Sequence, residues 1–227
     1  LQVLENKGVA DNTLVVFTTD HGDMMGHSDL AHKGYPHDSS LRTPVILWQP
    51  GTVPSGQVLD GPMESIDVPA TILDFAGLGD NPRKHLRQSP GYSFRSYALG
   101  EGPPPRTWAY AEVGYDDRGA QALSAVAPSP QEVLDAPVVS PGWRMVREAD
   151  WKYVYYPERA DALYDLVNDP WETNNLIAAP EQQQRISRMR LQLIESMRHC
   201  VTPNRFTMNQ ETYVDGEYAG YREGRNR

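Results

Sequence analysis

Short apolar runs between turn residues mark the first hundred positions of the chain. Residues 13–19 (TLVVFTT) and 44–48 (PVILW) are two such runs, each bounded by turn signals. Continuous apolar runs of this length are typical of strands buried on both faces, as in a parallel sheet. In the stretch SIDVPATILDFAG, Asp67 is the expected N-cap, Pro69 lies in the first turn and Gly77 follows the last apolar residue. The pattern predicts strand, loop, strand and helix, with an apolar helix face formed by Val68, Ile72, Leu73 and Phe75.

The pattern changes in the second half of the chain. Residues 107–113 (TWAYAEV) predict a strand, and residues 142–156 predict a hairpin whose turn lies at EAD. Residues 162–176 (ALYDLVNDPWETNNL) are interpreted as a polar turn region. Residues 180–200 predict a helix, because its apolar positions recur every three or four residues: Ile186, Met189, Leu193 and Met197. We therefore expect a small antiparallel sheet with one helix after the α/β region.

Two segments between these elements suggest connections. GEGPPPR, at residues 100–106, has the composition of a linker, and residues 114–141 are rich in Ala, Ser and Pro and predict a long loop. At the other end, LQVLENKG resembles the last turns of a helix that stops at Gly8, so we expect an upstream part to be missing.

Composition excludes some classes of function. The chain has 227 residues and a formal net charge of -9, which argues against a non-specific nucleic-acid partner. No apolar run approaches the ~20 residues of a membrane span. The single cysteine, Cys200, rules out an internal disulfide but leaves the compartment open.

The candidate chemistry lies in FTTDHGDMMGHSDLAHKG, directly after the first predicted strand. Asp20 and His21 offer a carboxylate oxygen and an imidazole nitrogen, both of which are metal ligands. Neighbouring residues of a strand point to opposite faces, so both reach one ion only if the chain turns, which Gly22 permits. Lys33 suits an anionic substrate oxygen. Taken alone, an Asp at a strand end is more often a cap and a lysine more often solvated; the order of the whole string favours a site.

This string, with two later stretches in the same order, resembles the sulfatase family of the alkaline-phosphatase-like superfamily. The first stretch carries Thr-Asp-His-Gly, then a lysine, then Ser-x-Arg-x-Pro before an apolar strand. The later stretches are MVREADWKYVYYPE and ALYDLVNDPWETNNL. The resemblance covers residues 1–200. It implies an α/β fold: the C-terminal portion of the family's main α/β sandwich at residues 1–100, a small α+β subdomain at 101–200, and a polar tail at 201–227.

The resemblance also implies roles for the matched residues. Asp20 and His21 would bind a divalent metal ion, with Ca, Mn, Mg and Zn not distinguished. Lys33 would bind the oxygens of a sulfate- or phosphate-type ester, and His32 is the weaker candidate for the proton donor. Asp38 and Arg42 would hold the loop rather than take part in the chemistry.

The family's nucleophile is a formylglycine made within Cys/Ser-x-Pro-x-Arg, and this sequence lacks that motif. In CVTPNR, proline and arginine come one position too late, so Cys200 is interpreted as the last turn of a helix. We therefore expect a metal-dependent sulfate-ester hydrolase whose N-terminal half, with the formylglycine and the remaining metal ligands, lies outside the chain, and we expect the isolated chain to be inactive. One alternative is a phosphonate monoester or phosphodiester hydrolase, which the His after the metal Asp favours. Another is a non-catalytic fragment that self-associates through an exposed apolar face, or contacts the missing half through it.

Overall fold

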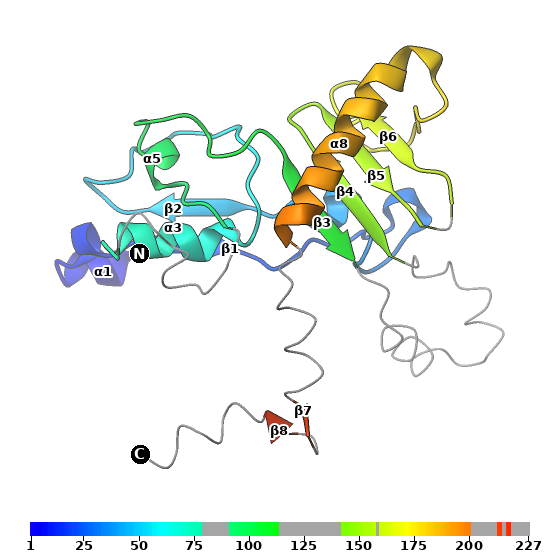
Figure 1. Cartoon of the computed structure of the whole chain (residues 1–227). Helices are drawn as coiled ribbons and strands as arrows, with labels where there is room; N and C mark the ends of the chain where they lie inside the picture. Colours follow the sequence, from blue (N-terminus) through cyan, green and yellow to red (C-terminus); the bar gives the residue numbers. More distant parts are fainter. Residues whose placement is uncertain (79–90, 114–141, 158, 201–212, 215–216, 219–227) are drawn as a thin grey trace. The chain divides into compact units, whose positions relative to one another are not determined.

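The computed structural model describes residues 1–78, 91–113, 142–157, 159–200, 213–214 and 217–218 (Figure 1). The predicted loop at 114–141 lies outside these residues, as does most of the predicted tail. Leu1–Leu193 forms one compact unit, and Ile194–Arg227 forms a second. The second unit contains the last turns of α8 and the paired strands β7 (Tyr213–Val214) and β8 (Glu217–Tyr218).

The first part of the compact unit consists of short elements. In chain order they are α1 (Gln2–Asn6), η1 (Ala10–Asn12), β1 (Val15–Thr18), η2 (His27–Asp29), α2 (Asp38–Leu41), β2 (Val45–Trp48), α3 (Asp67–Phe75) and α5 (Arg95–Ala98). Both predicted strands and the predicted helix are present.

The expectation of a parallel sheet is wrong for these two strands. β1 and β2 pair antiparallel, with Val15 opposite Trp48 and Phe17 opposite Ile46. A parallel pair needs a crossover connection, usually a helix, and α2 has only four residues. The loop instead returns the chain directly, so β2 runs back along β1. Burial on both faces is not observed either, because Phe17 and Ile46 are exposed.

Helix α3 begins one residue earlier than expected, with Ile66 and not Asp67 as its N-cap, and it buries a different face. Its buried residues are Asp67, Ala70 and Thr71, whereas Ile72 is exposed. Among the described residues, the carboxylate of Asp67 makes no hydrogen bond to a backbone N–H group in the first turn of α3. Its carboxylate accepts hydrogen bonds from the backbone N–H groups of Glu64 and Tyr92, at 2.8 Å each. Buried polar groups need partners, so Asp67 joins the segments before and after the helix.

The predicted linker at 100–106 is fixed at its end. The guanidinium of Arg106 donates to Glu64 and, over 2.6 Å, to Asp67 Oδ1, and it lies over the ring of Tyr92. The backbone N–H of Tyr110, in β3, also donates to Glu64 Oε1. The start of the second sheet is therefore tied to the start of α3 by a buried ion pair.

The second part is a four-stranded antiparallel sheet in the order β3-β4-β5-β6. Its strands are β3 (Ala109–Val113), β4 (Trp143–Arg147), β5 (Trp151–Tyr155) and β6 (Ala162–Asp165), followed by η3 (Pro180–Gln182) and α8 (Gln183–Cys200). The predicted strand, hairpin and helix are confirmed, and Cys200 is the last residue of α8. β6 was expected to be a turn region, and its pairing of Leu163 with Tyr153 corrects that interpretation.

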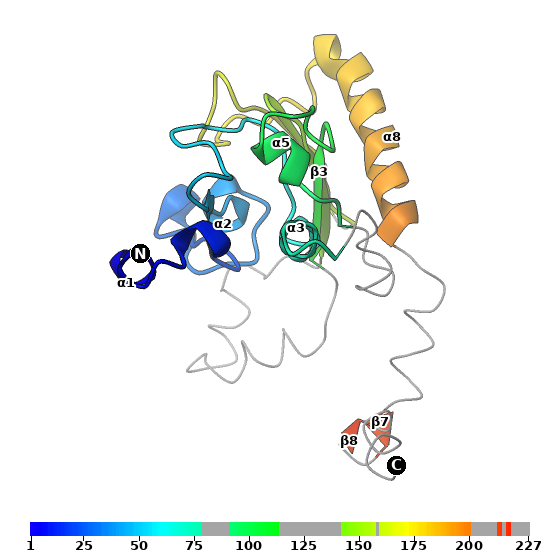
Figure 2. The same cartoon turned by 90° about the vertical axis from the view of Figure 1, so that its left-hand side faces the viewer.

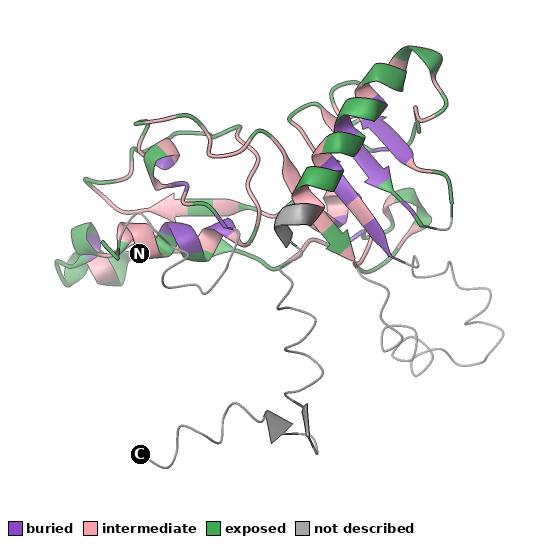
Figure 3. Cartoon of the chain, in the orientation of Figure 1, coloured by how far each residue is buried: buried purple, intermediate pink, exposed green. Residues whose placement is uncertain are grey.

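Successive side chains along each strand point to opposite faces of this sheet. Both faces carry buried residues and are therefore covered. One face carries Val146, Tyr153 and Leu163, all fully buried. It faces α8, because Arg190 Nε of that helix donates to the Tyr153 hydroxyl over 2.9 Å, and Figure 2 shows α8 alongside the sheet. The other face carries a second core cluster of Trp143, Met145, Val154, Tyr156, Ala162 and Tyr164, with Leu41 of α2 against it. Figure 3 shows burial concentrated in β4, β5 and β6.

Two leucines of α8 test the packing of the helix. Leu193 is 5% exposed and Leu191 is 68% exposed. We expect Leu193→Ala to lower the free energy of unfolding by about 2–5 kcal/mol, because it removes buried methyl groups and leaves a cavity. The matched variant Leu191→Ala should change it by less than about 0.5 kcal/mol. Urea unfolding of both variants measures the difference, and equal losses would show that α8 does not pack through Leu193.

Candidate active site

The loop after β1 folds back on itself and brings two predicted site residues together. Backbone hydrogen bonds cross it from Met24 N to His32 O at 2.8 Å and from Gly26 N to Leu30 O at 2.9 Å. This pairing places Lys33 beside the start of the loop. Its Nζ lies 2.9 Å from Nε2 of His21. Residues twelve positions apart in the sequence therefore form one pair.

The tautomer of His21 follows from its second hydrogen bond. Nδ1 lies 2.7 Å from the carbonyl oxygen of Gly22, which can only accept, so Nδ1 carries the proton. Nε2 is then the ring nitrogen with a free lone pair. Such a nitrogen can accept from the Lys33 ammonium or bind a metal ion.

Asp20 completes this group at the surface. Its Oδ1 accepts from His21 N at 3.0 Å and from Thr19 Oγ1 at 3.2 Å, while Oδ2 lies 3.5 Å from His21 Nε2. Desolvation tends to raise the pKa of Asp20, but the charge that His21 carries when its ring is protonated, together with the hydrogen bonds from Thr19 and from backbone N–H groups, outweighs it and holds the pKa below its ordinary value. The carboxylate is thus kept ionised and close to the imidazole.

The donor set of Asp20 and His21 fits part of a site for a divalent cation. Two ligands of one ion, each about 2.0–2.6 Å from it, lie roughly 3–4 Å apart, as Oδ2 and Nε2 do. Among the described residues, however, no group of three or more His, Cys, Asp or Glu side chains could hold a metal ion. Further His, Cys, Asp or Glu ligands would have to come from outside these residues.

In the part of the chain that the structure describes, no helix has the combined length and apolar character of a membrane span.

Gly22 is required here for space and not for a left-handed backbone. Its N–H donates to the Ser40 carbonyl over 2.7 Å, and a Cβ at this position would lie 2.1 Å from the Ser39 carbonyl oxygen. The sequence argument that glycine permits a turn is therefore corrected. Only a residue without a side chain lets the loop lie directly on α2.

The far end of the loop is held by the same helix and by the sheet. Gly34 N donates to Ser40 Oγ over 3.3 Å, and its carbonyl accepts from Trp143 Nε1 over 2.8 Å. Both ends of the loop, next to His21 and Lys33, are thus anchored on Ser40 or its neighbours. The position of the pair depends on where α2 is fixed.

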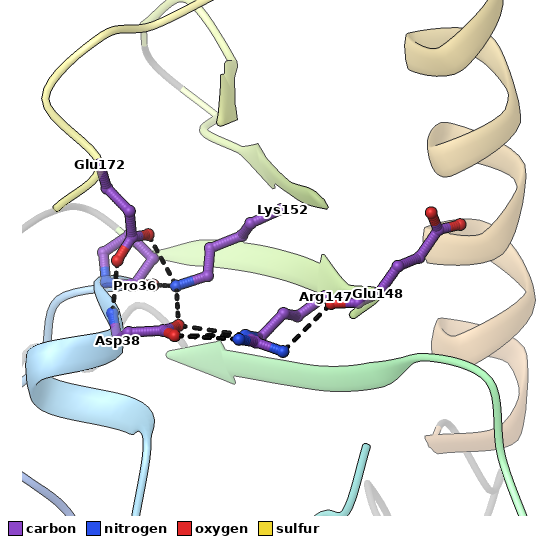
Figure 4. Close-up of polar contacts among 6 residues, drawn as sticks. All are labelled: Pro36, Asp38, Arg147, Glu148, Lys152 and Glu172. Atoms are coloured by element: carbon purple, nitrogen blue, oxygen red, sulfur yellow. Dashed lines mark hydrogen bonds and ion pairs between the residues drawn. The ribbon is translucent and has the colours of Figure 1, made fainter. Parts of the chain in front are cut away.

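A buried lysine of β5 fixes α2 (Figure 4). Nζ of Lys152, which is fully buried, donates to Asp38 Oδ1 at 2.5 Å, to Glu172 Oε1 at 2.7 Å and to the Pro36 carbonyl at 2.9 Å. Glu172 Oε2 in turn accepts from the backbone N–H of Asp38 at 2.6 Å. Arg147 adds two guanidinium nitrogens to the Asp38 carboxylate. Every hydrogen of the ammonium has an acceptor, which is the condition for burying a charge.

The pKa values of the two acids of this network, Asp38 and Glu172, shift in opposite directions. Burial tends to raise the pKa of Asp38, but Lys152 and Arg147 together outweigh it, so the pKa is lowered. Burial also raises the pKa of Glu172, and there the single cation Lys152 does not outweigh it. Asp38 is therefore the firmly ionised partner, in agreement with its expected role of holding the loop.

The predicted proton donor His32 is exposed and has a left-handed backbone, with φ of 65°. Among the described residues its imidazole has no hydrogen bond to His21 or Lys33. Its role therefore stays a prediction.

His37 is the most perturbed histidine of the segment. Its Nδ1 is buried and has no hydrogen-bond partner in the part of the chain that the structure describes, and its ring contacts those of His27 and Tyr164. Burial lowers the pKa of His37 to about 4, with Lys152, His27 and Arg159 acting in the same direction and Asp38 against it. The imidazole is neutral in the folded protein.

Sequence reasoning treated Lys152, Trp143 and Glu172 as parts of structural stretches and did not connect them with the loop. A weak signal existed, because Lys152 interrupts an otherwise apolar strand, WKYVYY. A lysine at a strand position between buried neighbours needs a carboxylate partner. Which carboxylate supplies it depends on residues 114 and 20 positions away, and no local pattern shows that.

The described fold is that of part of an alkaline-phosphatase-like hydrolase. A solved phosphonate monoester hydrolase from Agrobacterium radiobacter superposes with a TM-score of 0.67 at 26% identity, covering 87% of this chain and 38% of that protein. A family model described as Sulfatase matches residues 1–78.

Comparison with curated proteins gives the same family. An arylsulfatase of Clostridium perfringens is 28% identical over 226 residues, which cover 95% of this chain and 38% of the relative. A choline-sulfatase of Rhizobium meliloti is 30% identical over 180 residues, which cover 79% of this chain and 30% of the relative. The chain belongs to the sulfatase family, and the matched residues cover only 30% to 38% of the length of these relatives.

The Lys152 network is tested by removing its charge. Lys152→Met keeps most of the unbranched side chain but leaves Asp38 and Glu172 buried without their shared cation. We expect the free energy of unfolding to fall by about 3–5 kcal/mol. Arg188→Met, which removes the more exposed ion pair with Glu148, should cost less than about 1 kcal/mol. Similar losses in urea unfolding would show that the buried network does not stabilise the fold.

The neutral state of His37 predicts a dependence of stability on pH. Because the folded-state pKa, about 4, lies below the ordinary value of 6.5, the unfolded chain binds more protons between these values. The free energy of unfolding should therefore fall as the pH drops from about 6.5 towards 4. We expect His37→Phe, which keeps a ring of similar size, to flatten this decline, and the control His32→Phe to leave it unchanged. Urea unfolding at several pH values checks this, and parallel curves for wild type and His37→Phe would refute it.

Proposed function

We propose that this chain supplies the metal- and anion-binding loop of a sulfate-ester hydrolase. The observation that carries the proposal is the close grouping of Asp20, His21 and Lys33 at one end of a loop anchored at both ends. A carboxylate and an imidazole beside an ammonium can bind a cation and an anion together. Membership of the sulfatase family supports sulfate esters as the substrate class.

Each residue has a distinct task in this proposal. Asp20 and the free lone pair of His21 Nε2 would hold the divalent metal, which when bound supplies a Lewis acid for a sulfate oxygen. Lys33 would bind another sulfate oxygen and offset the charge that develops on the leaving oxygen. His32 would donate the proton to that oxygen. The Gly22 and Gly34 anchors keep these groups in place, so that little reorganisation is needed during the reaction.

Hydrolysis also needs a nucleophile, and the sequence offers no Cys/Ser-x-Pro-x-Arg motif for formylglycine. Nucleophile and charge-stabilising groups act as a unit in catalysis. We therefore propose that residues 1–227 alone bind a sulfate ester without turning it over. The nucleophile would belong to a part of the protein outside this chain.

Hydrolysis of phosphonate monoesters is the second candidate. His21 follows Asp20, and imidazole suits Zn and Mn better than Ca. The similarity to the phosphonate monoester hydrolase structure adds support. Both candidates use the same three residues on a tetrahedral anion, so they differ in substrate and not in the role of the loop.

Binding of inorganic sulfate tests the loop. We expect Lys33→Ala to weaken binding about tenfold or more, because a hydrogen bond between charged groups contributes about 1.5–3 kcal/mol. Lys7→Ala, which removes another exposed lysine at the end of α1, should leave binding unchanged. NMR titration of residues 1–227 with sulfate, in the presence of a divalent metal, measures both affinities.

Equal affinities of the two variants would show that Lys33 does not bind the anion. In the same samples, 4-nitrophenyl sulfate and a 4-nitrophenyl phosphonate monoester should bind without release of 4-nitrophenol. Reproducible release by the purified chain would show that the nucleophile lies within residues 1–227.

A further inference from the structure

An exposed tryptophan lies beside the tip of the same loop. Trp171 retains 65% of its surface exposed, whereas the other four tryptophans are buried or half-buried. Its ring centroid lies 5.5 Å from that of His27, with the planes tilted by 40°. His27 belongs to η2, between the two arms of the loop that carry His21 and Lys33. An aromatic surface is therefore placed against the loop and left largely open to solvent.

The position of Trp171 is fixed by the residue that follows it. Glu172 is buried and binds both Lys152 and the backbone N–H of Asp38. The backbone of Trp171 is therefore held in place by the network that anchors the loop, although its own side chain is largely exposed to solvent. Single exposed hydrophobic residues are common on protein surfaces, but Trp171 is set apart by its neighbour Glu172, which belongs to a buried ion network.

Backbone strain in the described residues gathers in the same region. Left-handed backbone conformations occur at five residues other than glycine: Met25, Ser28, Asp29, His32 and Glu172. Four lie in the loop, and the fifth directly follows Trp171. Such conformations cost about 1–3 kcal/mol each and tend to cluster where a protein binds or reacts. The strain is thus concentrated where the loop and Trp171 meet.

The length of the loop sets the distance between Trp171 and the anion-binding pair. Two cross-loop hydrogen bonds, two residues apart on each arm, separate Lys33 from the tip. Because the arms of the loop contain left-handed residues, the rise of about 3.3 Å per residue of extended chain gives only an upper limit: His27 stands within about 10 Å of the hydrogen bond between Met24 and His32. A sulfate held at Lys33 would allow a ring attached to it to extend over this distance.

We propose that Trp171, with His27 beside it, is a stacking subsite for the ring of the ester's organic group, either an aromatic ring or the flat face of a sugar. This inference rests on the proposed function, since it assumes that the sulfate is held at Lys33. Indole faces bind both kinds of ring through apolar contact and quadrupole interactions. The subsite selects ring-bearing esters over inorganic sulfate and small aliphatic esters.

The test uses the indole N–H signal of Trp171, assigned by its loss in Trp171→Phe. Residues 1–227 are titrated with 4-nitrophenyl sulfate, glucose 6-sulfate and inorganic sulfate. We expect the signal to move with one or both ring-bearing esters and not with inorganic sulfate, and the responding ester identifies the kind of ring. Trp171→Ala should weaken that ester's binding about fivefold or more and leave inorganic sulfate unaffected. Trp171→Phe should keep most of the affinity.

Val167→Ala is the matched control, because Val167 precedes Trp171 in the same turn region and is 66% exposed. A loss with Trp171→Ala no larger than with Val167→Ala would overturn the subsite. So would an equal loss for inorganic sulfate, which would mean that the variant only disturbs the loop. Tighter binding of choline sulfate than of either ring ester would also overturn it, in favour of a quaternary-ammonium site.

Failure of the proposed function gives a different result. Inorganic sulfate would then not bind the wild-type chain, while 4-nitrophenol or glucose without sulfate would still move the Trp171 signal. That outcome would support the subsite and refute anion binding at Lys33.

Discussion

The buried ammonium of Lys152 is the interaction on which the arrangement of the loop depends. A lysine without contact to water must find three acceptors, and it finds them on two other segments: Pro36 and Asp38 on one, and Glu172 on the other. A charge in this position disfavours any structure in which one of these segments moves away. The sheet, the segment before α2 and the turn after β6 are consequently held to one another. The electrostatic requirement of a single side chain thus becomes a geometric constraint on the candidate active site.

Because of this constraint, the two parts of the compact unit contribute differently to the candidate site: one carries the loop, and the other supports it. The loop that carries His21 and Lys33 has little core of its own, and several of its residues are in strained conformations. The antiparallel sheet has a core on each face, and its Trp143 and Lys152 reach out of that core to the loop. Rigid support therefore comes from one segment of the chain and the exposed reactive groups from another, which is a common way to preorganise a site.

Sequence patterns predicted this structure well where the information is local. The stripe of Ile186, Met189 and Leu193 gave helix α8, and the turn at EAD gave the β4–β5 hairpin. The metal pair Asp20 and His21 came from the resemblance, and the structure places their side chains together, although it does not test their roles. The antiparallel pairing of β1 with β2 was not predicted, because an apolar run carries no information about the direction of its neighbour. The role of Gly22 was attributed to conformational freedom, since the nearness of Ser39 arises only when α2 is folded against the loop.

The anchoring of the loop at Gly22 and Gly34 has a consequence for how such proteins can diversify. Both tethers lie outside the tip, so sequence changes between them leave the bonds to Ser40 and Trp143 intact. The exposed tip of the loop, residues 25–29, is therefore free to vary in composition at little cost to the scaffold, whereas Met24 is buried and a side chain at Gly22 would meet the backbone of α2. Selection can alter what the tip recognises while the groups at the base keep their positions. Within a segment of fewer than twenty residues, changes at the tip can therefore alter substrate specificity without moving the reactive groups at the base.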